Sequence, residues 1–395
     1  MWRYQYNASK CAVVVFNSCK IRNNNNPRDY TVYLGDIPLD GVEHYKLLGI
    51  ICHRRSFTSC IVKDCCDKIR GTFFSLVKYG FNDDGLQPLT CKHIYNAVVI
   101  PKALYGSECW PLLSKTDMLT LERAHRLCLK YIQGLSARTS TEVMLSLLNC
   151  LPIEYEIDRR KLILFGQLCR LETECAIKSM FLHRLCLFTL GNAGSGFLPE
   201  VGRILDKHGM RSILIQYLSD GSFPCKDAWK KMVKAKTKNT FVTEWNARTS
   251  VDAFSRFRVV HKHFDVSFLW VFTKTNTKLI AVVKVVAQLI AYLLRFDDQC
   301  IRCELSHLCN FTDHLLLDCP YVASIRNDMY LKLAARFGID LVQTVRALPR
   351  HALVHTLLCL WHPLIEGSLL SSECYNDFLC TVFRCIYTMY LAYPR

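Results

Sequence analysis

Apolar residues recur three and four positions apart over most of this chain, from Phe57 onward. This spacing places them on one face of a helix, which can pack against a core while the opposite face stays in water. The sequence Thr-Ser-Thr-Glu at residues 139–142 fits a capping box and predicts a helix that begins near Ser140. Four segments show the helical spacing most clearly: residues 61–77, 94–105, 118–132 and 143–148. We therefore expect most of the chain to be α-helical.

Residues 1–56 have a different pattern, in which polar and apolar residues alternate as they do in β-strands. Turn-forming residues separate the apolar stretches, which favours short antiparallel strands. Three stretches are expected to be strands: residues 11–16, 31–34 and 45–50. The expected fold class is therefore α+β: mainly α-helical, with a small antiparallel β meander at the amino terminus.

Two stretches that contain glycine and serine, residues 192–196 and 219–224, interrupt the helical pattern most clearly. Such stretches favour turns and loops, so a linker region is expected around them. Four parts follow from these boundaries: a β segment at 1–56, a helical domain at 57–190, a linker region at 191–225 and a basic helical carboxyl-terminal domain at 226–395.

The chain is strongly basic, with 50 Lys and Arg against 34 Asp and Glu and a net charge of +16. Cationic side chains that neutralise phosphates release condensed counterions, so this excess favours a nucleic acid as partner. Charge that serves only solubility is the ordinary alternative. Residues 226–238 hold six lysines, and residues 254–264 interleave basic and aromatic side chains. The candidate contacts from these two segments are Lys230, Lys231, Arg256, Arg258 and Lys262.

One pattern of cysteines and histidine has the spacing of a metal site. It consists of Cys300, Cys303, His314 and Cys319. Two close pairs of such ligands can complete a tetrahedron around Zn²⁺, which predicts a structural zinc knuckle with no open position for water. His307 and Cys309 lie within the same segment, residues 300–320, and could replace His314 or Cys319 as ligands. Coincidence is the alternative, because the chain contains 22 cysteines.

The other cysteines favour a reducing, intracellular compartment. They occur singly in predicted helices and strands, as buried cysteines do, rather than in a framework of short spacings. The first thirty residues contain no long apolar stretch, so no secretory signal is expected. The most apolar segment, residues 279–294, is interrupted by Lys284 and Gln288 and is shorter than the roughly 20 residues that span a membrane. We expect it to be a core helix and the protein to have no membrane segment.

Several enzyme classes are disfavoured by the motifs. The sequence contains no phosphate-binding glycine loop and no nucleophile elbow. A redox Cys-x-x-Cys is expected at a helix start after a strand, whereas Cys300 follows an apolar helix. A zinc deaminase needs Pro before the Cys-x-x-Cys, where this chain has Gln299. The acidic pair Asp83-Asp84 lies in a predicted turn rather than in a two-metal site.

A series of motifs follows in a recognisable order. Residues 7–11 (Asn-Ala-Ser-Lys-Cys) precede a valine-rich stretch, and residues 45–50 read Tyr-Lys-Leu-Leu-Gly-Ile. Next come residues 99–110, which end in Tyr-Gly-Ser-Glu-Cys-Trp, and residues 151–162. The Cys-Cys-His-Cys cluster ends the series. In this order the motifs resemble the carboxyl-terminal portion of a non-LTR (LINE-type) retrotransposon reverse transcriptase, over most of the chain.

The resemblance implies that the parent polymerase copies RNA into DNA with two metal ions, Mg²⁺ in the intact enzyme, held by palm aspartates. In this chain the Ala-Asp-Asp-type box would lie upstream of Met1. We therefore expect no catalytic residue and no polymerase activity in this chain. The missing palm and fingers portion of the polymerase is expected to be one of its partners. The segment at 321–395 shows no pattern of a nuclease.

The resemblance also implies roles for the parts that are present. Residues 1–56 would end the palm, with Asn7 and Lys10 in its last blocks and Gly49 in the strand that grips the primer end. Residues 57–190 would form a helical thumb-like bundle that follows the minor groove of an RNA:DNA hybrid. Arg159, Arg160 and Lys161 would suit that contact, though a solvated helix face is the ordinary alternative. The zinc cluster is implied to hold template RNA or target DNA.

Two hypotheses follow. In the first, the chain is a fragment of a reverse transcriptase that binds RNA or an RNA:DNA hybrid without polymerising. In the second, it is a zinc-stabilised helical interaction protein whose basic faces bind acidic protein partners. A steep dependence of RNA affinity on salt would favour the first, because several phosphate contacts release several counterions.

Overall fold

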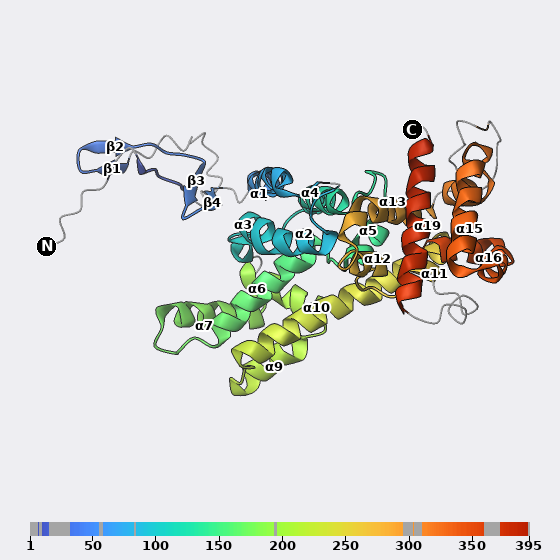
Figure 1. The fold of residues 1–395 in the computed structure, drawn as a ribbon. Coiled ribbons are helices and arrows are strands. Elements are labelled where there is room, and N and C mark those ends of the chain that lie inside the picture. The colour runs from blue at the N-terminus through green and yellow to red at the C-terminus, as the bar shows by residue number, and fades with distance from the viewer. Residues whose placement is uncertain are drawn as a thin grey trace. The chain divides into compact units, whose positions relative to one another are not determined.

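The computed structural model describes residues 7, 10–15, 32–54, 58–82, 84–192, 196–294, 303, 310–358 and 372–393. The chain is mainly α-helical and has a small antiparallel β region near its amino terminus (Figure 1). The fold class expected from the sequence is confirmed.

Two β-hairpins make up the β region. Strands β1 (Val32–Leu34) and β2 (Ile37–Leu39) pair with each other, as do β3 (His44–Leu47) and β4 (Ile50–His53). Residues 45–50, expected to form one strand, instead contain a two-residue turn at Leu48 and Gly49, with φ of +49° and +87°. Positive φ at both positions produces the tight turn that suits a hairpin. Residues 10–15 contribute one bridge, from Val13 to Gly41.

The chain divides into two compact units. Unit 1 comprises residues 1–71, 99–124 and 153–237, and unit 2 comprises residues 72–98, 125–152 and 238–395. The helices are α1 (Thr58–Ser75), α2 (Pro88–Ile94), α3 (Ile100–Ala103), α4 (Lys115–Gln133), α5 (Thr141–Leu148), α6 (Ile153–Cys169), α7 (Ala176–Thr189), α8 (Phe197–Lys207), α9 (Arg211–Asp220), α10 (Lys226–Thr249), α11 (Ser255–Val260), α12 (Phe268–Phe272), α13 (Ile280–Tyr292), α14 (Phe311–Asp313), α15 (Ala323–Phe337), α16 (Ile339–Arg346), α17 (Arg350–Leu357) and α19 (Ser372–Ala392). Three of these helices, α1, α4 and α10, contribute residues to both units.

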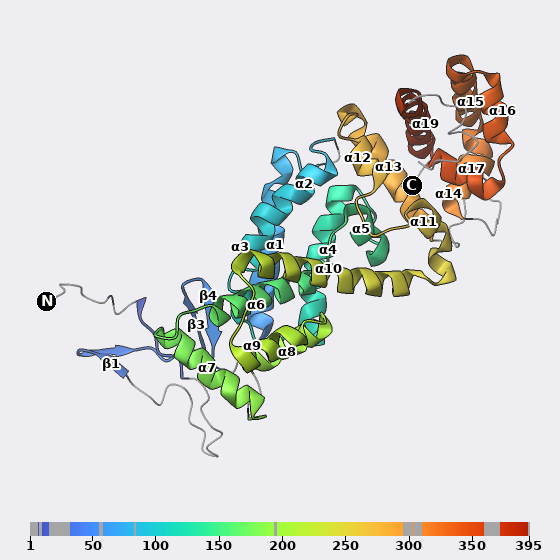
Figure 2. The same ribbon diagram turned by 90° about the horizontal axis from the view of Figure 1, so that it is seen from below.

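In unit 1, α6 to α9 lie near the first part of α10 (Figure 2). Buried apolar side chains from these helices form one core. Trp229 of α10 is fully buried there, and its Nε1 donates a hydrogen bond to the carbonyl oxygen of Leu162 (2.8 Å). The indole lies directly against Gly166 of α6, where an added Cβ would come within 2.3 Å of Trp229 Nε1. Only glycine therefore permits α6 and α10 to approach this closely.

The region at 191–225, expected to be a linker, carries α8 and α9. Val201, Leu205 and Leu214 from these helices are buried in the same core as Trp229. The glycine- and serine-containing stretches mark the ends of helices within unit 1, because such residues interrupt a helix whether or not a domain ends there.

Unit 2 contains the apolar helix that the sequence predicts. In α13, Val283, Val286 and Leu289 are buried, and the Lys284 ammonium donates to the carbonyl oxygen of Asn82 (2.8 Å). Helix α5 begins at Thr141 after its N-cap Ser140, whose Oγ accepts from the backbone of Glu142, so the predicted helix start is confirmed. Within the described residues, no helix is both long and apolar enough to cross a membrane.

Candidate nucleic-acid interface and metal centre

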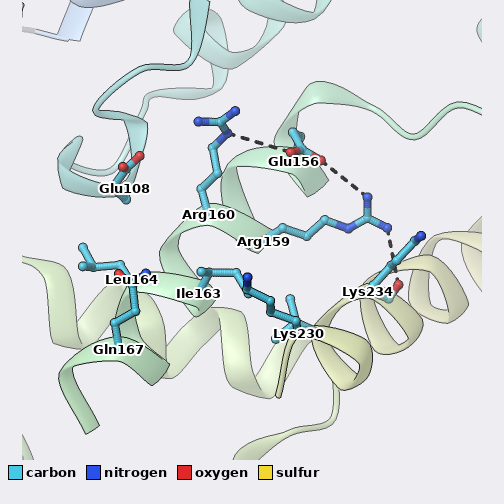
Figure 3. Close-up of a pocket in the computed structure, with 10 residues that line it drawn as sticks. Glu108, Glu156, Arg159, Arg160, Ile163, Leu164, Gln167, Lys230 and Lys234 are labelled. Carbon is cyan, nitrogen blue, oxygen red and sulfur yellow. Dashed lines mark hydrogen bonds and ion pairs between the residues drawn. The ribbon is translucent and has the colours of Figure 1, made fainter. Parts of the chain in front are cut away.

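Helix α6 carries two adjacent arginines, Arg159 and Arg160, and a glutamate one turn earlier. A spacing of three and four residues places Glu156 on the same side of the helix as both. Its Oε2 lies 3.4 Å from Arg159 Nη1 and its Oε1 lies 3.8 Å from Arg160 Nε (Figure 3). Both distances exceed the roughly 2.7–2.9 Å of a strong charge-assisted hydrogen bond. The carboxylate therefore holds the two guanidinium groups loosely.

Neutral acceptors orient the two guanidinium groups. Arg159 Nε donates to Thr237 Oγ1 (2.8 Å), and its Nη2 donates to the carbonyl oxygen of Lys234 (3.3 Å), both in α10. Arg160 Nη1 donates to the carbonyl oxygen of Leu104 (3.2 Å). Because these acceptors carry no charge, they fix the arginines without cancelling their positive charge.

A cavity of about 460 Å³ lies between α6 and α10 in unit 1. Four cations, two carboxylates, one amide and three apolar side chains line it: Arg159, Arg160, Lys230, Lys234, Glu108, Glu156, Gln167, Ile163, Leu164 and Val233 (Figure 3). We call this the basic pocket. It brings together two of the basic segments of the sequence, which lie about seventy residues apart along the chain.

Lys161 does not belong to this surface, although it was expected to contact nucleic acid. Its side chain is buried, and its Nζ donates to Glu200 Oε1 (2.6 Å) and to the carbonyl oxygen of Trp110 (2.8 Å). Burial lowers the pKa of Lys161, and Glu200 acts against that shift. Consecutive helical residues point about 100° apart, so a run of three basic residues cannot present all of its charges on one face.

The two lysines expected from α10 differ in position. Lys230 lines the basic pocket together with Lys234, one turn further along the helix. Lys231 is exposed, but it is not one of the described residues that line the cavity. Trp229 and Val233, which directly precede Lys230 and Lys234, are buried, and this fixes the rotation of α10 that points the two lysines at the pocket.

The basic residues of α11 in unit 2 have partners of another kind. Arg256 Nη2 lies 2.5 Å from Asp313 Oδ1. The Arg258 guanidinium lies 4.5 Å from the ring centroid of Trp245, and its Nη1 donates to Asn246 Oδ1 (3.2 Å). Lys262, which follows α11, is exposed.

The predicted contact residues of the β region are Asn7, Lys10 and Gly49. Asn7 and Lys10 are exposed; the Asn7 carbonyl accepts from Lys10 N (3.0 Å), and the Lys10 carbonyl accepts from the Tyr45 hydroxyl (2.7 Å). Gly49 occupies the β3–β4 turn, where an added Cβ would lie 3.2 Å from the ring of Tyr105. Lys10 thus contacts strand β3 of the hairpin whose turn contains Gly49.

Three of the four candidate metal ligands come together in unit 2. The ligand atoms of Cys303, His314 and Cys319 all lie within 4.8 Å of one another, and Cys303 Sγ is 3.3 Å from His314 Nε2. His314 and Cys319 are buried, and Cys303 is half-buried. This group could hold a metal ion. Three further candidates lie outside the described residues: Cys300, His307 and Cys309.

A single turn of π-helix, His314–Asp318, joins His314 to Cys319. Cys319 N donates to the carbonyl oxygen of His314 (2.7 Å), which brings the two ligand residues together. Just before this turn, Asn310 Nδ2 donates to the carbonyl oxygen of Tyr292 (2.7 Å), and Thr312 Oγ1 donates to that of Leu289 (2.8 Å). Both acceptors belong to the last turn of α13, whose carbonyl groups have no partner within the helix. The ligand segment is thereby anchored to α13.

Three charged residues of the basic pocket were not among the candidates from the sequence: Glu108, Glu156 and Lys234. Lys234 lies in the six-lysine segment, and its spacing of four from Lys230 places both on one face. Glu156 could have been found by the same spacing rule from Arg160. Nothing in the sequence indicates that Glu108 joins them, because its position depends on how residues 107–109 pack against α6.

No family model, no curated protein and no solved structure matches this chain. The resemblance to reverse transcriptases therefore stays a prediction from the order of motifs. Function is inferred from the residues and their geometry.

Proposed function

We propose that this chain binds RNA or an RNA:DNA hybrid, and that the basic pocket contacts the phosphate backbone. The observation that carries the proposal is the convergence of Arg159 and Arg160 of α6 with Lys230 and Lys234 of α10 around one cavity. Their charges come from two segments that are separate in sequence, and neutral acceptors hold both arginines in place.

The lining of the pocket suits a nucleotide unit. Guanidinium groups bind phosphate oxygens through paired N–H donors, and lysines add point charges. Ile163, Leu164 and Val233 supply an apolar surface against which a base or ribose can pack. The volume of about 460 Å³ falls within the roughly 300–1,000 Å³ of small-molecule sites.

We propose further that the chain is the carboxyl-terminal portion of a retrotransposon reverse transcriptase and does not polymerise by itself. The support for this is the order of motifs from residues 7–11 to the Cys-Cys-His-Cys cluster. Primer extension with purified protein and Mg²⁺ or Mn²⁺ tests it. We expect no synthesis, and template-dependent synthesis above a heat-inactivated control would contradict it.

We propose that the metal is Zn²⁺ in a structural role, with Cys300 as the fourth ligand. Thiolate and imidazole donors favour zinc, and a tetrahedral site with Zn–S of about 2.3 Å and Zn–N of about 2.0–2.1 Å separates its ligand atoms by roughly 3.5–3.8 Å. Ligand atoms within 4.8 Å of one another can reach this geometry with small shifts. Four protein ligands would leave no open position for water.

The decisive test of polyanion binding compares two neighbouring lysines. Lys230→Gln removes a cation that lines the pocket, whereas the matched control Lys231→Gln removes an exposed cation beside it. We expect Lys230→Gln to lower RNA affinity evenly across sequences and to reduce the slope of log K against log salt by about 1. Equal effects of the two variants would contradict the role of the pocket. A flat salt slope in the parent protein would favour acidic protein partners instead.

A further inference from the structure

Both metal-ligand residues of the π-turn directly follow an aspartate that is bound by an arginine. Asp313 precedes His314 and pairs with Arg256 of α11 (Nη2 to Oδ1, 2.5 Å). Asp318 precedes Cys319 and pairs with Arg350 of α17. In that second pair Arg350 Nη1 donates to Oδ1 (2.9 Å), and Nη2 contacts Oδ2. The two ion pairs thus hold the two ends of one helical turn.

A third contact acts on the second ligand itself. Arg326 of α15 donates from Nη2 to the carbonyl oxygen of Cys319 (3.2 Å). Together with the anchoring of Asn310 and Thr312 to α13, the backbone from residue 310 to residue 319 is held at several points by hydrogen bonds and ion pairs of described residues. None of these contacts uses the atoms that would bind the metal.

The two ion pairs differ in how far water can screen them. The side chains of Arg256 and Asp313 are 21% and 13% exposed, whereas those of Arg350 and Asp318 are 51% and 32% exposed. A half-exposed pair contributes little, because solvent and salt weaken it and long side chains lose entropy in forming it. The Arg256–Asp313 pair is therefore the stronger of the two constraints.

We propose that Arg256 is a positioning residue of the metal site. It fixes Asp313, and through it the backbone of His314, so that the imidazole is in place before the metal binds; Arg350 does the same for Cys319 more weakly. Positioning in advance reduces the entropy lost on binding, which raises affinity without adding a ligand. The inference rests on the proposed zinc site and is independent of the basic pocket. It also gives Arg256 a role other than the phosphate contact expected from the sequence.

The test measures the Zn²⁺ affinity of the full chain by competition with a chromophoric chelator, and the absorption spectrum of the Co²⁺-substituted protein. We expect Arg256→Gln to lower Zn²⁺ affinity about 10–100-fold, as substitutions around metal ligands commonly do, and to change the Co²⁺ ligand-field bands. Arg350→Gln should lower affinity less. Arg258→Gln is the matched control, because Arg258 lies on the same helix but pairs with Trp245 and Asn246.

Rescue separates positioning from general destabilisation. The charge exchange Arg256→Asp with Asp313→Arg should recover part of the lost affinity, and Asp313→Asn should reproduce the loss even if Arg256→Gln fails to fold. The inference is overturned if Arg256→Gln and Arg258→Gln have equal Zn²⁺ affinities, or if the exchange recovers nothing. Absence of Zn²⁺ binding in the parent protein would overturn the zinc site as well. RNA binding by Arg256→Gln should equal that of the parent protein, because Asp313 compensates the charge of Arg256.

Discussion

The basic pocket of unit 1 and the basic helix α11 of unit 2 contain the same kinds of side chain but use them differently. In the pocket, Arg159 and Arg160 bind neutral acceptors and share one loosely held glutamate. In α11, Arg256 is bound closely by its own carboxylate, Asp313. The two regions differ in whether the fold places a carboxylate in close contact with the guanidinium group, and this decides how far the positive charge is compensated.

Removal of the metal should have the largest effect on stability, and this effect should be confined to unit 2. We expect Cys319→Ser to lose zinc and to destabilise unit 2 by more than about 3 kcal/mol, because the binding energy of a structural metal is also folding energy. Hydrogen exchange followed by mass spectrometry should show faster exchange in α13 and α14 and unchanged exchange in α6 to α9. Cys186→Ser, at an exposed cysteine of unit 1, is the control. Equal zinc content in Cys319→Ser and the parent protein would exclude this ligand.

Removing charges from the basic pocket should have the next largest effect, here on RNA affinity. The double variant Arg159→Gln with Lys230→Gln should weaken RNA binding by about 2 kcal/mol, or roughly thirtyfold, because two charged hydrogen-bonding groups are lost. The counterpart in α11, Arg256→Gln, should change RNA affinity less than about twofold, because Asp313 already compensates the charge of Arg256. Fluorescence anisotropy at fixed salt measures both. Equal losses of RNA affinity would show that the basic pocket and α11 contribute alike, and would contradict the difference between them.

A pH titration should distinguish the units through a buried histidine of unit 2. Burial lowers the pKa of His125 to about 4, and its Nδ1 is hydrogen-bonded to the Tyr95 hydroxyl (2.8 Å). Since the imidazole of the unfolded chain titrates near its ordinary pKa of 6.5, the folded state binds fewer protons, and stability is lost as the pH falls from about 6.5 toward 4. We expect this residue to contribute a loss of about 1 kcal/mol between pH 7.5 and 5.5.

Urea unfolding at the two pH values, monitored by hydrogen exchange in α2 and α5 of unit 2, measures this loss. His125→Gln should be less stable at pH 7.5, because it disturbs a buried hydrogen bond, but its stability should change less with pH. A parent protein whose stability rises on acidification to pH 5.5 would contradict the assignment. His355, whose pKa is also lowered to about 4 by burial, adds to the same trend.

The smallest expected change in RNA affinity tests the role of the carboxylate beside the arginines in each region. Glu156→Gln keeps the shape of the side chain and removes the negative charge that competes for Arg159 and Arg160. RNA affinity should rise about threefold at low salt. Asp313→Asn, the corresponding change beside Arg256, should leave RNA affinity unchanged. Competition anisotropy can resolve this difference, and a fall in affinity of Glu156→Gln would mean that the carboxylate supports binding rather than opposing it.

The sequence predicted the elements of this fold better than their associations. Periodicity found the helices and identified 279–294 as a core segment, because both depend on local spacing. It read residues 45–50 as one strand, since the pattern of side chains does not reveal that Leu48 adopts a positive φ. Glycine and serine around 191–225 indicated a linker where two helices contribute to the core, because a turn looks the same between helices as between domains.

The candidate sites show the same limit. The metal site could be predicted from the spacing of its ligands, because His314 and Cys319 lie at the two ends of one helical turn. Three of the four predicted ligands come together in the structure. The basic pocket could not be predicted as one site, because the cations of α6 and those of α10 come together only when the two helices pack. Charge alone also could not show that Lys161 pairs with Glu200 in the interior, or that Arg256 pairs with Asp313.

The contact between Gly166 and Trp229 determines the spacing of the cationic side chains in the basic pocket of unit 1. It sets how near α6 comes to α10, and therefore how far Arg159 and Arg160 stand from Lys230 and Lys234. An alanine at position 166 would force the indole away and widen the interval between the two rows of cations, although every charge would remain. The spacing of the cations on this surface is thus set from the interior, by a residue that does not itself line the pocket.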